Sequence, residues 1–214
     1  MKHFKKITTA VVAGALSLTM GVIALAGCAG GKDYTFEAED ALQEGLKASS
    51  GTTAIVETDV PYKVDGKLVE DATISGVGNF DTVGQKMTWT VVSASATSAT
   101  LTIHAASACM TMSQEFMGIL EMDISKTEAF KLTVNGTAVT LSGKLPGTTF
   151  ESFEAMAEPG TWWNLGTLTG KADLKEGENV IVLEVVGAYE GAKNSGLNVD
   201  KLVINSGAEL TPKA

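Results

Sequence analysis

The chain has 214 residues, with 25 acidic residues against 16 lysines, no arginine and a formal net charge of −9. Such an acidic chain disfavours nucleic acid as a partner because the phosphate backbone is itself negative, and the absence of arginine removes the usual bidentate reader of phosphate and carboxylate groups. An acidic surface instead suits neutral ligands and divalent cations.

The N-terminal segment has the layout of a secretory signal peptide, since lysines precede a stretch at 7–26 that no acidic residue interrupts. It ends in Leu25-Ala26-Gly27-Cys28, which resembles the lipobox of bacterial lipoproteins. The resemblance implies that a signal segment 1–27 is cleaved and that Cys28 receives a diacylglycerol, whose two acyl chains suffice for stable anchoring. Residues 28–32 would then be a lipidated tether on the cell membrane, facing outside the cytoplasm. The alternative is an uncleaved transmembrane anchor, because roughly 20 residues can just span a bilayer.

Cleavage would remove one of the two histidines and three lysines, leaving His104, Cys109 and 13 lysines against 25 acidic residues. A single histidine excludes multi-histidine zinc sites and makes a serine or cysteine triad hard to assemble. With Cys28 lipidated, Cys109 has no disulfide partner within the chain. His104 alternates with Leu101 and Ile103, which predicts an ordinary strand histidine.

Period-two patterns separated by turn signals dominate residues 33–206 and predict an all-β, antiparallel architecture with few helices. Met87–Val91 and Leu101–Ile103 alternate apolar and polar residues, and we expect them to be adjacent strands with Trp89 in the core. Asn135-Gly136 joins two alternating segments and predicts a hairpin with a type I′ turn. Val180–Leu183 is a continuous apolar run, as expected for a central strand.

The remaining elements follow weaker signals. Asp65-Gly66 indicates a second hairpin, and residues 150–158 indicate a short amphipathic helix. Residues 199–204 are expected to form the closing strand, followed by a C-terminal tail at 207–214.

Several segments, in order, resemble carbohydrate-binding modules of families 6 and 35. They are Tyr34–Ala41 with its Glu-Ala-Glu signature, Ser75–Asp81, Met87–Val91, Leu101–Ile103, the Val134-Asn135-Gly136 turn, Thr161–Trp163, Leu174–Ile181 and Leu197–Ile204. The resemblance implies a jelly-roll, galactose-binding-like β-sandwich over 33–206. Residues 47–72 and 110–128 look like insertions beyond the compact form of the family.

The resemblance also implies a structural calcium ion that joins the first strand to the last through Glu37, Glu39 and Asp200, with a carbonyl from 73–76. Calcium takes six to eight oxygen ligands without strict geometry. Glu37 and Glu39 would point to the same face of a strand, where a cation would compensate two like charges. The alternative is that both carboxylates face solvent on an edge strand.

Sugars stack on aromatic rings while their hydroxyls bond to amide side chains. Trp162 and Trp163 offer such a platform, and the resemblance adds Asn198 as a ligand-binding amide. Asn79 matches a family aromatic and cannot stack. The alternative is that both tryptophans pack in the core.

We therefore expect a monomeric, non-catalytic lipoprotein that binds a poly- or oligosaccharide at the membrane. One alternative is an adhesive or structural surface protein that binds a protein partner. The other is a glycan-processing enzyme using two carboxylates, which the length of the chain disfavours.

Overall fold

The computed structural model describes residues 30–45, 55–112, 117–190, 192 and 196–213. The predicted signal segment and Cys28 lie outside these residues, so cleavage and lipidation stay predictions. Within the described part of the chain, no helix is long and apolar enough to cross a membrane.

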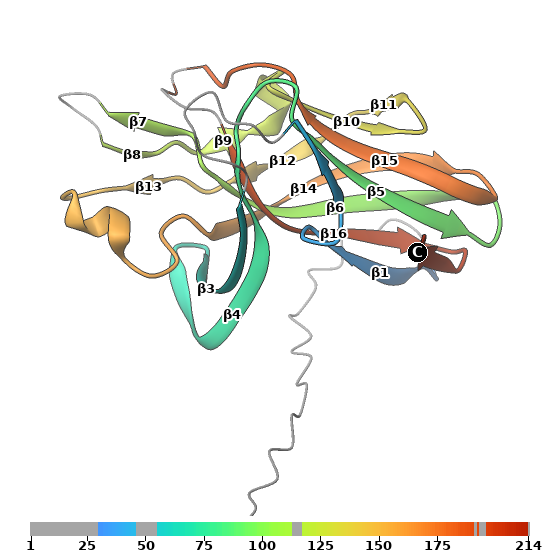
Figure 1. Ribbon diagram of the computed structural model, residues 1–214, viewed down its shortest axis with the longest axis horizontal. Coiled ribbons are helices and arrows are strands. Elements are labelled where there is room, and N and C mark those ends of the chain that lie inside the picture. The colour runs from blue at the N-terminus through green and yellow to red at the C-terminus, as the bar shows by residue number, and fades with distance from the viewer. Residues whose placement is uncertain (1–29, 46–54, 113–116, 191, 193–195, 214) are drawn as a thin grey trace, which may run out of the picture.

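Two β-sheets pack face to face around one core (Figure 1). The larger sheet contains β1 (Lys32–Glu37), β16 (Leu197–Ser206), β6 (Thr97–Ser107), β14 (Asn164–Leu174), β12 (Ser142–Leu145), β9 (Met122–Asp123), and β3 (Ile55–Val64) with β4 (Lys67–Phe80). The second contains β11 (Thr137–Val139), β10 (Phe130–Val134), β15 (Gly177–Val185), β5 (Lys86–Ser93), β17 (Leu210–Pro212) and β2 (Leu42–Glu44). The predicted all-β, antiparallel sandwich is confirmed, and among the strand pairings of the described residues only that of β3 with β14 is parallel.

Strict alternation of buried and partly exposed residues places the core between the sheets. In β5 every second residue is buried, from Met87 to Ser93, and β6 alternates in the same way from Ala99 to Ala105. This is the burial pattern that a strand with one face on a core produces. The prediction that Trp89 lies in the core is confirmed.

The expectation that the strands around Met87–Val91 and Leu101–Ile103 are neighbours is wrong. β5 pairs with β15, β17 and β2, whereas β6 pairs with β14 and β16 in the other sheet. Alternation shows which side of a strand is buried and says nothing about its partner. The short link at 94–96 crosses from one sheet to the other, so both strands bury their apolar sides in the same core.

Both predicted hairpins are present. Asn135 and Gly136 adopt positive φ between β10 and β11, and Asp65 and Gly66 do so between β3 and β4. The predicted central strand is β15, which lies between β10 and β5. The predicted closing strand is β16, which pairs with β1, and β17 lies within the segment 207–214 that was expected to be a tail.

The hairpin of β3 and β4 builds a second, smaller core. This hairpin projects away from the sheets (Figure 1). β4 pairs with one end of β16 and β3 with one end of β14, and β6 lies between β14 and β16. The pairings therefore close into a ring of β16, β4, β3, β14 and β6. Inside it lie the buried side chains of Tyr62, Ala106, Trp163 and Leu165.

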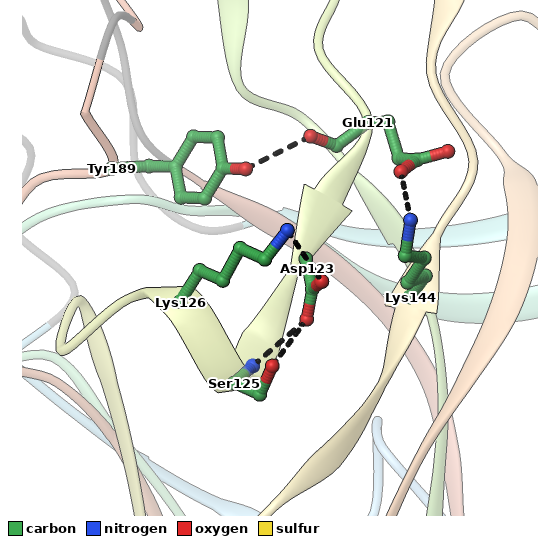
Figure 2. A network of polar contacts seen from close by, with 6 residues as sticks. All are labelled: Glu121, Asp123, Ser125, Lys126, Lys144 and Tyr189. Carbon is green, nitrogen blue, oxygen red and sulfur yellow. Dashed lines mark hydrogen bonds and ion pairs between the residues drawn. The ribbon is translucent and has the colours of Figure 1, made fainter.

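The region 110–128, which was expected to be an insertion, contains short strands. β7 (Met110–Met112), β8 (Met117–Ile119) and β13 (Thr148–Thr149) make a third sheet. β9 and the 3-10 turn η1 (Ile124–Lys126) follow, and Figure 2 shows the polar contacts around them. There the Tyr189 hydroxyl donates to the Glu121 carbonyl, Lys144 donates to the Glu121 carboxylate, and Asp123 accepts from Ser125 and pairs with Lys126.

The amphipathic helix expected at 150–158 is reduced to one 3-10 turn, η2 (Glu154–Ala157). Two of its carbonyls serve other donors: Thr161 Oγ1 donates to Ala155 O at 3.3 Å and Trp162 Nε1 donates to Met156 O at 2.9 Å. The loop therefore folds onto the Trp162 side chain instead of continuing as a helix.

Candidate functional site

A cleft of about 580 Å³ lies where the small core meets the η2 loop. Its walls come from β3, from the end of β4, from the start of β7, from residues 156–163 and from β16. All four residues that the sequence assigned to ligand binding line this cleft: Trp162, Trp163, Asn198 and Asn79. The first and last of them, Asn79 and Asn198, are 119 residues apart along the chain, and the strand ring brings the four together.

The two tryptophans differ in their burial. Trp163 is 2% exposed and belongs to the small core, with its Nε1 donating to Glu57 Oε2 at 3.0 Å. Trp162 is half-buried, and its ring lies 6.1 Å from that of Phe150 at 58°. Both indole N–H groups bond to the protein, which holds the rings in fixed orientations. Trp162 is therefore the ring that a ligand can reach.

Asn198 connects the two walls of the cleft. Its Nδ2 donates to Trp162 O at 2.8 Å, and its Oδ1 accepts from the Asn79 backbone N–H at 3.2 Å. Asn79 has a φ of 57°, a left-handed conformation that asparagine tolerates better than most residues. The buried Asn198 thus fixes the positions of the Trp162 loop and of the end of β4 at Asn79, so its role is positioning.

Carboxylates that sequence reasoning missed also line the cleft: Glu57, Asp81 and Glu158. Glu57 lies on β3, inside the segment regarded as an insertion, and no motif marked it. Its Oε1 lies over Gly78, where a Cβ would come within 2.5 Å of that oxygen. A signal was available for Asp81, because it directly follows Gly78-Asn79-Phe80 at the end of β4.

The three predicted metal ligands lie around the junction of β1 and β16. β1 ends at Glu37, so Glu39 lies in the following turn and the expectation that both carboxylates share a strand face is wrong. Asp200 occupies a register shift of β16 and is 3% exposed, and its carbonyl accepts from the Ala38 N–H at 3.0 Å.

Electrostatics show that these carboxylates influence one another. Burial raises the pKa of Asp200, and Glu39 adds to the rise, whereas Lys201 opposes it. Burial likewise raises the pKa of Glu37, and Asp200 and Glu39 contribute in the same direction. Glu37 and Asp200 are therefore each held in surroundings that disfavour their negative charge, as expected where a cation would compensate.

The donor set fits calcium in its chemistry, although the side chains do not converge. Glu39 Oε2 is buried without a hydrogen-bond partner, and buried polar atoms without partners are rare in proteins. Against this, Lys201 Nζ lies 3.2 Å from Asp200 Oδ2 and already supplies a positive charge. Across the described residues, no three His, Cys, Asp or Glu side chains are arranged to hold a metal ion.

Comparison with known proteins gives structural neighbours only. No family model and no curated protein matches the chain. A family 35 carbohydrate-binding module from Clostridium thermocellum shares 23% identity at a TM-score of 0.47, over 81% of this chain and 97% of the module. The C-terminal family 6 module of LamC, a marine laminarinase of Zobellia galactanivorans, shares 15% identity at a TM-score of 0.44. That alignment covers 81% of this chain and 99% of the module.

A third neighbour is a Podospora anserina β-(1,4)-mannanase that carries a family 35 module, with 18% identity and a TM-score of 0.45. The alignment covers 85% of this chain and 28% of that enzyme. Because all three TM-scores lie below 0.5, these likenesses establish neither the family nor the ligand of this chain.

The geometry itself defines what the cleft can do. It offers one reachable indole ring, amide groups and carboxylate oxygens in a hollow large enough for a small polar ligand. Such a mixture of an apolar surface and a few placed polar groups is typical of binding sites for small molecules.

Proposed function

We propose that this chain is a non-catalytic carbohydrate-binding lipoprotein, displayed at the outer side of the cell membrane by lipid on Cys28. The observation that carries the proposal is the cleft in which Trp162, Asn79 and Asn198 meet. The lipobox-like Leu25–Cys28 segment supports the anchoring, and the sandwich that begins at Lys32 would lie close to the membrane.

The Trp162 ring supports the assignment to sugars. Its half-buried indole is held from behind by Phe150 and by the hydrogen bond to Met156 O, so part of its surface is left for a ligand. The C–H face of a pyranose is apolar and packs on such a ring. Binding to a ring that is already oriented loses less conformational entropy.

The carboxylates and the Asn79 side chain support the polar half of recognition. Sugar hydroxyls donate to carboxylate oxygens, and charged acceptors make the stronger hydrogen bonds. Glu57, Asp81 and Glu158 surround the cleft on different elements, so hydroxyls on several sides of a ring would find partners.

We also propose that Glu37, Glu39 and Asp200 hold a structural calcium ion, which requires their side chains to turn toward one another because they do not converge in the structure. Calcium would add to the positive charge that Lys201 places beside the buried Asp200, and it would tie β1 to β16 near the two ends of the domain. Its role would be structural, since none of these three residues lines the cleft.

The surface around the cleft favours one alternative function. Phe153, on the η2 loop, is 64% exposed, and Met112 on β7 is 42% exposed. Exposed apolar side chains of this kind are common in protein interfaces. A surface protein that binds a protein partner is therefore the second candidate.

The test is a glycan-binding screen of the purified chain, followed by titration of the best ligand with two variants. Trp162→Ala should weaken binding about five- to 150-fold, if a sugar stacked on an aromatic ring contributes the roughly 1–3 kcal/mol that a stacked base does. Phe153→Ala, which removes an exposed aromatic from the same loop but outside the cleft, should bind like the parent. If Trp162→Ala binds as tightly as the parent, the proposed site is wrong.

A further inference from the structure

The cleft carries negative charge that no lysine of its lining balances. Glu57, Asp81 and Glu158 line it, and among the described residues that do so there is no cation. The chain has no arginine that could reach in from elsewhere.

The ion pairs of the described residues lie elsewhere. The acids that pair with lysine are Glu121, Asp123, Glu178, Glu184 and Asp200, none of which lines the cleft. Lys63 lies beside the cleft without lining it. Its side-chain stem packs against Gly160, and its backbone N–H donates to Trp163 O. It forms no ion pair with the three carboxylates in the described structure.

The cleft is also poor in free hydrogen-bond donors. Trp162 Nε1 donates to Met156 O, Trp163 Nε1 to Glu57 Oε2, and Asn198 Nδ2 to Trp162 O. The hydroxyl of Thr161 donates to Ala155 O. Most side-chain donors of the described lining therefore serve the protein itself, which leaves mainly the Asn79 amide to donate to a ligand.

Acceptors remain available in the same walls. Glu57 uses Oε2 for Trp163, and Asp81 uses Oδ1 for the Thr82 hydroxyl, so each keeps a second carboxylate oxygen. Glu158 is exposed at the rim of the cleft. A ligand that fits must donate hydrogen bonds and carry no negative charge.

We infer that the cleft selects a cationic amino sugar, a hexosamine with a free ammonium group, over its N-acetylated form and over uronic acids. The inference rests on the proposed function and names its ligand class. An ammonium group supplies three donors and a positive charge, and its hydrogen bonds to carboxylates are of the stronger, charge-assisted kind.

The same chemistry disfavours the other sugar classes. N-acetylation removes the charge and two of the donors. A uronic acid brings a carboxylate next to three others, and like charges facing each other across an interface suppress binding.

The experiment is calorimetric titration of the whole mature chain with three trisaccharides. The first is built of glucosamine with free amines, the second of N-acetylglucosamine, and the third of neutral sugars with one glucuronate. At about pH 6 a sugar amine is protonated, since ordinary α-amino groups titrate near 7.7–8.0. We expect the glucosamine trisaccharide to bind about tenfold more tightly than its acetylated form, and the glucuronate compound not to bind. Raising the salt from about 0.01 M to about 1 M, which shortens the Debye length from about 30 Å to about 3 Å, should remove most of the preference.

Glu57→Gln is the matched variant. Glutamine keeps an oxygen for Trp163 Nε1 and removes the charge, so it should weaken binding of the amine several-fold more than binding of the acetylated sugar. Asp81→Asn, which keeps an acceptor for Thr82, should act in the same direction. Glu176→Gln, an exposed acid in the turn before β15 and outside the cleft, should leave the preference unchanged.

The outcomes separate the two claims. Equal binding of the amine and acetylated sugars, tighter binding of glucuronate, or binding of neutral glycans alone in the screen overturns the amino-sugar inference and leaves carbohydrate binding standing. Absence of binding to every glycan in the screen overturns both.

Discussion

The large core fills the space between two broad sheets, whereas the small core is enclosed by a ring of five strand ends and closed by one hairpin. No described residue of the large core lines the ligand cleft. Trp163 belongs to the small core and forms part of one wall of the cleft. The stability of the sandwich and the shape of the cleft therefore depend on different groups of residues. Substitutions in the large core should lower stability most, and those in the small core should change the cleft at lower cost to stability.

The largest effect is expected in the large core. Leu101 is fully buried on β6, so Leu101→Ala should lower the free energy of unfolding by about 2–5 kcal/mol through lost burial and the cavity left behind. Leu42→Ala on the exposed edge strand β2, where the side chain is 63% exposed, should cost less than about 0.5 kcal/mol. Urea unfolding measures both, and similar losses would contradict the assignment of the core.

Removal of calcium should have the second largest effect on stability if the proposed ion is present. A ligand at about 100 times its dissociation constant stabilises by about 2.7 kcal/mol, so a chelator should lower the Tm by several degrees. Asp200→Asn should have the same Tm with and without chelator, while Glu176→Gln should respond like the parent. An unchanged Tm of the parent, or purified protein without stoichiometric calcium, would remove calcium from the account.

His104 should make stability depend on pH. Burial lowers its pKa to about 4 from 6.5, and nearby Lys201 acts in the same direction. The folded chain binds this proton more weakly than the unfolded chain, so the contribution is fully present above pH 6.5 and is lost as the pH falls towards 4. Between pH 7 and 5 the loss should be about 2 kcal/mol.

His104→Gln isolates this contribution from the titrating carboxylates. The difference in unfolding free energy between parent and variant should shift by that amount over the same pH range. Parallel stability curves would show that His104 is equally easy to protonate in both states.

The smallest effect on stability is expected in the small core. A Cβ on Gly76 would come within 2.7 Å of both Trp163 Cη2 and the Val199 carbonyl, so Gly76→Ala should cost about 1–2 kcal/mol and weaken ligand binding by displacing the indole. Gly207→Ala is the control, since its Cβ would meet only Thr97 Oγ1 at 3.8 Å. Denaturant unfolding and ligand titration of both variants check the prediction. Normal binding by Gly76→Ala would show that the position of Trp163 does not shape the cleft.

The sequence predicted the large core well because its residues alternate within single strands. Met87 to Val91 on β5, and Asn135-Gly136 between β10 and β11, are local signals that need no knowledge of partners. The assignment of β5 and β6 to neighbouring positions failed because two strands on opposite sides of one core show the same alternation. Their partners depend on where a three-residue link crosses the sandwich.

The site was predictable only in part. The adjacent aromatic residues marked Trp162, and the resemblance to carbohydrate-binding modules implied Asn198; the structure places both at the cleft with Asn79. The sequence could not tell which tryptophan is exposed. Trp163 is buried because its ring packs on Gly76 and its Nε1 donates to Glu57, and both residues lie far from it in the sequence. Glu57 itself was missed because β3 reaches the cleft through its parallel pairing with β14, a contact across about a hundred residues of sequence.

The most direct test of the central claim uses the indole N–H signals of the three tryptophans in a nuclear magnetic resonance titration with the best-binding glycan. Trp162 and Trp163 line the cleft, whereas Trp89 donates to Glu37 O at 3.1 Å in the large core. We predict that the Trp162 and Trp163 signals shift on addition of the sugar, with Trp162 shifting most, and that the Trp89 signal stays in place. A saturable interaction that leaves Trp162 and Trp163 unmoved would contradict the assignment of this cleft as the carbohydrate site.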